Sequence, residues 1–325
     1  MLLPIRLRDF VEDPDGWLYA VSTYDNENKV GCVLRYVPDD EGDRIGPSGQ
    51  HYQKYDFEDA YRKIAREKPA YAGLVQRIPL IDLRRVLKPD LEISRIAASH
   101  PRVKKLLDLF RLPPGAVGCT GSLLCGLQNE NSDIDMIVYG KHWFAAQTLV
   151  KQGIADGKIE GLSPEMWRKV YEKRQPAIPY DIFVLHEQRK WNRGQIEGTY
   201  FDILYTRSYD NLKGVPSGKG VVCGKQTIVA KVTDASLTFD NPAVYTVEHD
   251  RVKKVLSFTH TYSGQALAGE TIEACGVLEQ HGAEHWLIVG TTREAKGEYI
   301  ISKTLIEGDR YLSSQSQQFC PRMLT

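Results

Sequence analysis

The sequence predicts an α+β protein in which a mixed helix-and-strand core is followed by a region of strands alone. Three observations predict this class. Residues 1–90 mix strand and helix signals, residues 91–212 alternate helix and strand patterns, and close-spaced strand-like runs begin at about residue 213. These changes of pattern predict an accessory α/β domain over 1–90, a core over 91–212, a small β-domain over 213–310 and a polar tail over 311–325.

The composition is that of an ordinary globular chain. Of the 325 residues, 42% are hydrophobic and 26% are charged, and 42 basic residues balance 42 acidic ones. These values exclude a largely disordered chain and give no global sign of nucleic-acid or membrane binding. No apolar run approaches the roughly 18 residues that a membrane-spanning helix needs. The six scattered cysteines form no C-x-x-C pair, which predicts a reduced, cytoplasmic protein.

The N-terminal region is predicted to begin with a β-hairpin. Aromatic and β-branched runs over 17–22 and 29–37 are separated by Asp-Asn-Glu-Asn. A loop rich in Gly, Asp and Pro follows over 38–50, and the pattern after it predicts a helix over 56–67 with an Asp cap. This region is therefore predicted to be a folded domain rather than a linker.

In the middle region, short strands are predicted between longer helices. Apolar residues at helical spacing, buried strand-like runs and a Ser-Pro helix start mark these elements. The predicted helices cover 103–110, 141–153 and 164–174, and the predicted strands cover 116–120, 133–139 and 199–206.

The C-terminal region is predicted to form a small barrel with an OB-like fold. Its candidate strands cover 226–233, 244–249, 252–261, 271–279, 285–290 and 298–304. Their close spacing is typical of a small barrel or sandwich. A barrel of this kind either presents a groove to nucleic acid or serves as a structural or dimerising module, and composition does not separate these functions.

One stretch of the middle region carries the candidate chemistry. It consists of a strand, a Gly121-Ser122 turn, a short helix and a strand that begins Asp133-Ile-Asp135. Residues i and i+2 of a strand point to the same face, so both carboxylates project together. Such like charges are tolerated when they are exposed or when a divalent cation lies between them. The turn offers N–H groups and a hydroxyl to phosphate oxygens, so a nucleoside triphosphate site with Mg²⁺ is predicted.

This pattern resembles the signature of the DNA polymerase beta nucleotidyltransferase superfamily. Gly121-Ser122, a ten-residue spacer and Asp133-x-Asp135 between hydrophobic residues fill the positions of that signature. The resemblance covers about residues 90–210 and implies a polymerase beta palm-like catalytic core. The chain also resembles uncharacterised prokaryotic, mainly archaeal, nucleotidyltransferase-domain proteins, whose C-terminal region carries a stretch like Gly290-Thr-Thr-Arg-Glu-Ala-Lys-Gly-Glu-Tyr-Ile300.

The resemblance implies a third carboxylate on a neighbouring strand. Asp202, in a short β-rich run after a glycine turn, is favoured, and Asp181 in Pro-Tyr-Asp-Ile-Phe-Val-Leu competes with it. By resemblance, Asp133 and Asp135 bridge two Mg²⁺ ions, with Mn²⁺ as an alternative metal. Asp202 would hold the ion on the acceptor side and help to deprotonate the acceptor, while Ser122 would hold the β- and γ-phosphates.

A basic segment with interleaved aromatic residues lies over 168–193. It holds seven basic and three acidic side chains, a local charge of +4. Basic residues beside aromatic rings suit a triphosphate or a polynucleotide backbone, and a solvated helix face over core aromatics is the alternative. Arg189, Lys190 and Arg193 are the residues of this segment predicted to contact phosphate.

These observations predict an enzyme that transfers a nucleoside monophosphate from a triphosphate to a hydroxyl on RNA or DNA, with release of pyrophosphate. The alternatives are the same chemistry on a protein or a small molecule, and a non-catalytic module that binds nucleotide or nucleic acid.

Overall fold

The computed structural model describes residues 3–73, 75–212, 214, 216, 219–291 and 295–309. The chain forms two compact units: unit 1 comprises residues 1–162 and 192–215, and unit 2 comprises residues 163–191 and 216–325. The four predicted domains stay a prediction, and the two units divide the chain differently, because residues 163–191 belong with the C-terminal strands. The predicted tail over 311–325 and part of the stretch over 290–300 lie outside the described residues.

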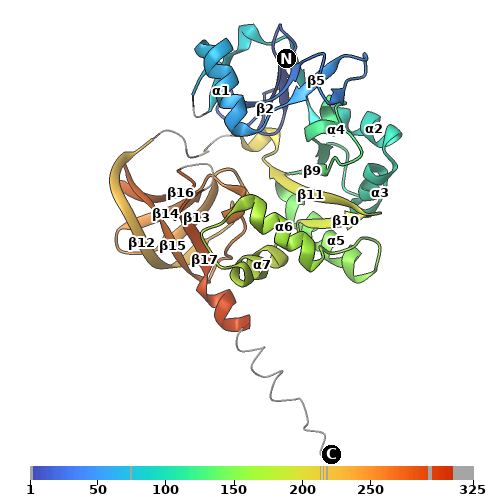
Figure 1. The fold of residues 1–325 in the computed structure, drawn as a ribbon. Helices are drawn as coiled ribbons and strands as arrows, with labels where there is room; N and C mark the ends of the chain where they lie inside the picture. Colours follow the sequence, from blue (N-terminus) through green and yellow to red (C-terminus); the bar gives the residue numbers. More distant parts are fainter. Residues whose placement is uncertain are drawn as a thin grey trace, which may run out of the picture. The chain divides into compact units, whose positions relative to one another are not determined.

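Unit 1 begins with an antiparallel N-terminal sheet (blue in Figure 1), in the order β4-β5-β3-β2-β1-β7, with β6 paired to β3. Helix α1 (Phe57–Glu67) buries Ala60 and Ile64 against this sheet, and the predicted Asp cap is confirmed because Asp56 accepts a hydrogen bond from the Asp59 N–H. The strands are β1 (Phe10–Glu12), β2 (Leu18–Val21), β3 (Lys29–Pro38), β4 (Arg44–Ile45), β5 (His51–Lys54), β6 (Gln76–Pro79) and β7 (Arg85–Leu87). The predicted hairpin is thus the pair β2–β3.

The second sheet of unit 1 has the order β10-β11-β9-β8 and is mixed. Its strands are β8 (Val117–Cys119), β9 (Ile134–Tyr139), β10 (Arg193–Ile196) and β11 (Thr199–Thr206). Strands β9 and β11 run parallel, whereas β8 and β10 are antiparallel to their neighbours. The helices of this part are α2 (Pro89–Ser99), α3 (Pro101–Phe110), α4 (Gly121–Cys125) and α5 (Trp143–Ala155). The apolar spacing that predicted α3 is confirmed, because Val103, Leu106 and Phe110 are buried.

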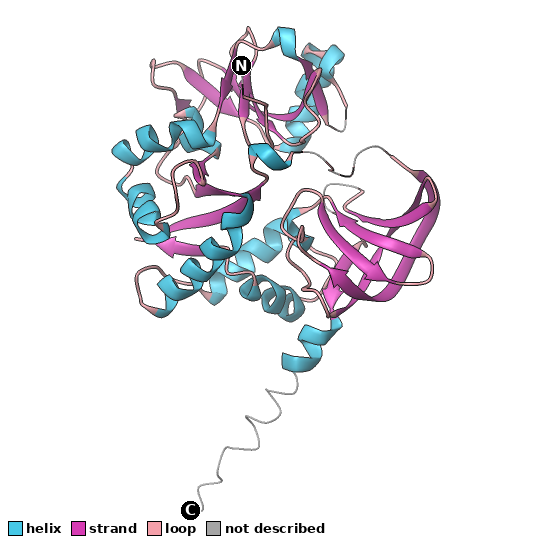
Figure 2. Ribbon diagram, turned by 180° about the vertical axis from the view of Figure 1, so that it is seen from behind, coloured by secondary structure: helices cyan, strands magenta, loops and turns pink. Residues whose placement is uncertain are grey.

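Unit 2 combines two helices with a six-stranded sheet. The helices are α6 (Pro164–Arg174) and α7 (Tyr180–Arg189), and residues 303–309 are also helical. The strands are β12 (Val221–Asp234), β13 (Ala243–Glu248), β14 (Val252–Ser257), β15 (Thr271–His281), β16 (Glu284–Val289) and β17 (Tyr299–Ser302). The pairing runs β12-β13-β14-β16-β15-β17, and β15 also pairs with β12. Figure 2 draws the strands in magenta and the helices in cyan. Short 3₁₀ segments complete the described chain: η1 (Pro69–Tyr71), η2 (Leu80–Asp82), η3 (Gly140–His142), η4 (Tyr209–Asn211) and η5 (His260–Tyr262).

The fold of α6 and α7 bears on two sequence-based expectations. Helix α6 has the predicted bounds, with Ser163 as its cap and Pro164 at its first position. The run that contains Asp181 is not a strand beside β9; it forms the first turns of α7. Pro179 stands at the N-cap of this helix, and its buried residues Phe183, His186 and Glu187 recur at helical spacing. This pattern outweighs the β-propensity of Ile182 and Val184. Over the described residues, no helix combines the length and apolarity needed to cross a membrane.

Candidate active site

Three carboxylates converge at the second sheet of unit 1, and we call Asp133, Asp135 and Asp202 the acidic cluster. Asp135 on β9 and Asp202 on β11 are directly paired in the register of the two parallel strands. Asp133 immediately precedes β9 and is exposed, whereas Asp135 and Asp202 are half-buried. Because paired residues of adjacent strands face the same side, these two side chains are neighbours. Of the two residues considered for the third carboxylate, the structure brings Asp202 to Asp135.

The Gly121-Ser122 corner lies directly against Asp135. The Thr120 N–H donates a hydrogen bond of 2.9 Å to the backbone carbonyl of Asp135. Gly121 has a φ of 67°, and a Cβ at this position would clash with Oδ2 of Asp135. Both the backbone conformation and the space therefore require glycine here. Ser122 follows in the first turn of α4 and is half-buried.

The environment of Asp135 raises the pKa of its carboxyl group. Burial is the largest cause that raises its pKa, and the negative charges of Asp202 and Asp133 raise it further, to about 6. Arg8 and Arg35 act in the opposite direction, but more weakly. A bound cation would offset the repulsion between such a carboxyl group and its two carboxylate neighbours.

Arg193 holds the third carboxylate from the opposite side. It pairs with Asp202 in the antiparallel register of β10 and β11, and its Nε lies 3.0 Å from Oδ1 of Asp202. The Arg193 side chain is buried, and that of Asp202 is 16% exposed. Arg193, predicted from the sequence to contact phosphate, is thus placed at the site through a carboxylate of the cluster; phosphate binding by Arg193 stays a prediction.

The donor set of the acidic cluster has the chemistry of a site for a hard divalent cation. Three carboxylates supply oxygen ligands, and the mutual repulsion that raises the pKa of Asp135 would be offset by a cation. In the described part of the chain, however, no three or more Asp, Glu, His or Cys side chains form a group arranged to hold a metal ion. The residue types fit Mg²⁺ or Mn²⁺, and metal binding stays a prediction.

The N-terminal region supplies three arginines to this site, Arg8 from the turn before β1, Arg35 from β3 and Arg44 from β4, and no motif in the sequence pointed to them. Arg8 and Arg35 act electrostatically on Asp135, as described above. Arg44 donates hydrogen bonds to Leu127 O at 3.4 Å and to Ser132 Oγ at 3.2 Å, so it braces the loop that leads into Asp133. The region over residues 1–90 therefore forms part of the surroundings of the acidic cluster.

Two other predicted phosphate-binding residues lie in unit 2. Arg189 forms an ion pair with Glu270 at 2.6 Å. Lys190 is buried, pairs with Glu187 and donates to Thr261 O at 3.1 Å. Nucleotide binding by Arg189 and Lys190 stays a prediction, and the competing Asp181 is exposed on the first turn of α7.

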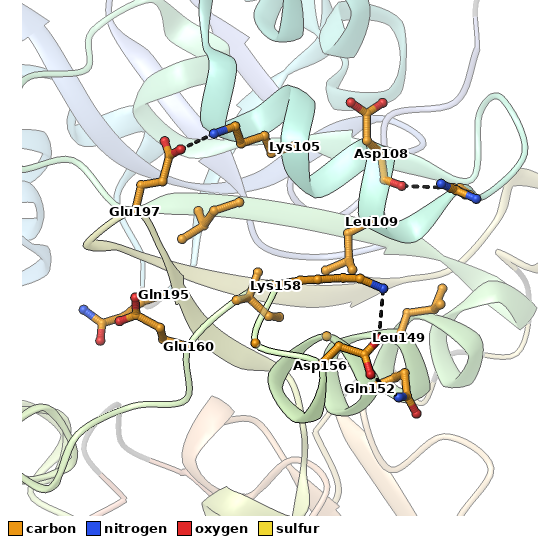
Figure 3. Close-up of a pocket in the computed structure, with 15 residues that line it drawn as sticks. Lys105, Asp108, Leu109, Leu149, Gln152, Asp156, Lys158, Glu160, Gln195 and Glu197 are labelled. Atoms are coloured by element: carbon orange, nitrogen blue, oxygen red, sulfur yellow. Dashed lines mark hydrogen bonds and ion pairs between the residues drawn. The ribbon is translucent and has the colours of Figure 1, made fainter.

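A separate pocket of unit 1 contains none of the predicted site residues (Figure 3). Its volume is about 640 Å³, and α3, α5 and the β10–β11 turn contribute its walls. Charged side chains around it are paired with one another: Lys105 with Glu197, and Lys158 with Asp156 at 2.9 Å. Arg111 donates from Nε to the backbone carbonyl of Asp108 at 3.2 Å.

Comparisons with known proteins agree with the geometry. A family model described as a nucleotidyltransferase domain matches residues 103–192, a segment that includes the Gly-Ser corner, Asp133 and Asp135 but ends before Asp202. The uncharacterized protein MJ1086 of Methanocaldococcus jannaschii is 35% identical over 336 aligned residues, which cover 92% of this chain and 99% of the archaeal protein. No solved structure matches the chain significantly.

Proposed function

Because the chain belongs to the DNA polymerase beta-like nucleotidyltransferase superfamily, we propose that it transfers a nucleoside monophosphate from a triphosphate to a hydroxyl on RNA or DNA. Pyrophosphate is the second product. One observation carries the proposal: Asp135 and Asp202 are paired across parallel strands, and the Gly121 corner lies against the carboxylate of Asp135. Carboxylates beside a phosphate-binding turn are the parts that this chemistry requires.

Different residues of the site act on the nucleotide and on the acceptor hydroxyl. The N–H groups of the corner and the Ser122 hydroxyl hold phosphate oxygens of the nucleotide. Asp202 accepts the proton of the acceptor hydroxyl, whose oxygen then forms a bond to the α-phosphorus as the bond to pyrophosphate breaks. Arg193 orients Asp202 for this step. When held by Asp133, Asp135 and Asp202, Mg²⁺ or Mn²⁺ supplies positive charge that stabilises the negative charge of the phosphoryl oxygens.

Support for a polynucleotide acceptor comes from unit 2. Its pairing passes from β12 through β13, β14, β16 and β15 and returns to β12, and β14 and β16 are parallel. A ring of five paired strands in this order is typical of an OB-like barrel, a fold that often binds single-stranded nucleic acid. We therefore propose that unit 2 is an OB-like domain that holds the acceptor.

The proposal is tested by incubating the protein with each α-³²P-labelled nucleoside triphosphate, Mg²⁺ or Mn²⁺, and RNA and DNA oligonucleotides with free 3′-hydroxyls. Label is expected on a polynucleotide, and the Asp135→Asn variant is expected to transfer none. Label on the protein itself or on a small molecule, without label on polynucleotide, would show that the acceptor is not a polynucleotide. No label on any acceptor with either metal would contradict the enzymatic proposal.

A further inference from the structure

Arg8 connects the N-terminal segment to both sides of the candidate active site. Its backbone carbonyl accepts a hydrogen bond of 2.7 Å from the Thr120 hydroxyl, one residue before Gly121. Its side-chain Nε donates to the backbone carbonyl of Tyr205 on β11 at 3.2 Å. Arg8 is therefore fixed beside the corner that the proposed function assigns to the phosphates, and its guanidinium is tied to the strand that carries Asp202.

The backbone of Arg8 adopts a conformation that arginine rarely takes. The Asp9 N–H donates to Arg6 O at 3.1 Å and closes a four-residue turn, with Arg8 as its third residue at a φ of 72°. Turns whose third residue has such a φ ordinarily place glycine or asparagine there. The other non-glycine residues with positive φ in the described chain lie between 44° and 48°. Strain of this kind is often retained where a side chain has a function.

Arg8 lies close enough to the acidic cluster to act on it electrostatically. Its positive charge is the first of the two that act on Asp135 against the repulsion of Asp133 and Asp202. A triphosphate seated on the corner would bring further negative charge to the same place. The Nε hydrogen bond to Tyr205 orients the guanidinium, and a guanidinium suits phosphate oxygens because its donors form a rigid fork.

On the basis of the proposed function, we propose that Arg8 binds the triphosphate of the incoming nucleotide. The N-terminal region then contributes a phosphate-binding residue to the active site and is not only an accessory domain. A purely structural function for Arg8, as a link between the N-terminal segment and β11, is the explanation that the experiment has to exclude.

The variant Arg8→Gly separates the two explanations. Glycine adopts a φ of 72° without strain, so the turn is kept while the guanidinium is removed. Arg111→Gly is the matched control, because Arg111 also has a positive φ, of 46°, and also donates from Nε to a backbone carbonyl, but lines the pocket of Figure 3. Both variants are compared with the wild type by thermal melting before binding is measured.

Binding is measured by calorimetric titration with ATP, GTP, CTP and UTP in the presence of Mg²⁺, and with the diphosphate and monophosphate of the base bound most tightly. Arg8→Gly is expected to weaken triphosphate binding about tenfold and monophosphate binding less than about twofold, as loss of a charge-assisted contact to the outer phosphates requires. Arg111→Gly is expected to bind all three ligands like the wild type.

The outcomes distinguish this inference from the proposed function. If the wild type binds a triphosphate and Arg8→Gly binds it equally well, Arg8 is structural and only the present inference is overturned. The same holds if Arg8→Gly weakens monophosphate and triphosphate binding by the same factor. If the wild type binds none of the four triphosphates, the proposed function fails, and the inference about Arg8 fails with it.

Discussion

The acidic cluster of unit 1 and the charged residues in and around α7 of unit 2 differ in whether each charge has a partner of opposite sign. In unit 2, Glu187 and Lys190 are almost wholly buried and pair with each other, Arg174 lies 3.4 Å from Glu187, and Arg189 pairs with Glu270. In unit 1, three carboxylates lie together, and the pKa of Asp135 is raised by burial and by its neighbours. The charges of α7 stabilise one another, whereas the acidic cluster keeps an excess of negative charge.

The presence or absence of a partner of opposite charge separates structural from functional charged residues. A paired buried charge is explained by the fold, because removing its partner would leave an unpaired ion in a medium of low polarity. A group of like charges is not explained by the fold and indicates a ligand of opposite charge. Replacing residues of the two groups should therefore affect different properties: activity in unit 1 and stability in unit 2.

The largest expected effect is that of Asp135→Asn. We expect the rate of nucleotide transfer to fall about a thousandfold or more, because a carboxylate of the site is lost. The free energy of unfolding should stay the same or rise, because a source of repulsion is removed. Label transfer and urea denaturation measure the two properties. A clear loss of stability would contradict the contrast between the groups.

The variant Lys190→Met should have the opposite effects. It leaves the buried carboxylate of Glu187 without its nearest cation, so we expect the free energy of unfolding to fall by about 3 kcal/mol. Lys169→Met on exposed α6 is the matched control and should change stability little. Urea denaturation measures both. If Lys190→Met were as stable as the control, the charges of α7 would not have the structural function assigned to them.

A third effect concerns pH and the buried His186 of α7. Burial lowers its pKa from the usual 6.5 to about 4, and its Nε2 accepts a hydrogen bond of 2.8 Å from the Ser302 N–H. Between these pH values the unfolded chain binds a proton that the folded chain does not. Unit 2 should therefore lose stability as the pH falls from about 6.5 to 4, by at most about 1.4 kcal/mol per pH unit.

The variant His186→Gln tests this pH dependence. Denaturation curves of the wild type and the variant between pH 7 and 4 should differ in slope, and the variant should show the flatter dependence. Equal slopes would mean that His186 already binds its proton in the folded protein or stays neutral in both states.

The smallest expected effect is that of Arg193→Gln. Because Arg193 contacts Asp202, we expect kcat to fall about fivefold, while KM for the nucleotide stays unchanged. Steady-state kinetics at several triphosphate concentrations measures both values. A raised KM with unchanged kcat would favour the direct phosphate contact that the sequence analysis predicted.

Local patterns in the sequence predicted the parts of the site that lie close together along the chain. The alternation of residues in a strand correctly placed Asp135 on β9, whereas Asp133 lies one residue before the strand, which begins at Ile134 rather than at the predicted residue 133. The glycine of the Gly-Ser corner has the positive φ of a tight turn. The strands of unit 2 were likewise confirmed within a few residues, apart from β12 and β14, which differ from their predicted bounds at one end. In each case the deciding interaction is local or repeats along one element.

The rest depends on contacts between distant residues. Nothing in the sequence around Arg8 marks it, because its relation to the acidic cluster arises through Thr120 and Tyr205, more than a hundred residues away. The basic side chains of 168–193 form one segment of the sequence, but Arg189 pairs with Glu270 and Lys190 with Thr261 in unit 2, whereas Arg193 pairs with a residue of unit 1. Such partner choices are invisible to composition and spacing.

The central claim is that Asp202 completes the acidic cluster, and a comparison of Asp202→Asn with Asp181→Asn tests it most directly. Both variants remove one carboxylate that the sequence offered as the third of the site, and their transfer of α-³²P-labelled nucleotide is measured beside the wild type. We predict that Asp202→Asn loses nucleotide transfer and that Asp181→Asn retains it. Retained transfer in Asp202→Asn, or its loss in Asp181→Asn alone, would contradict the account.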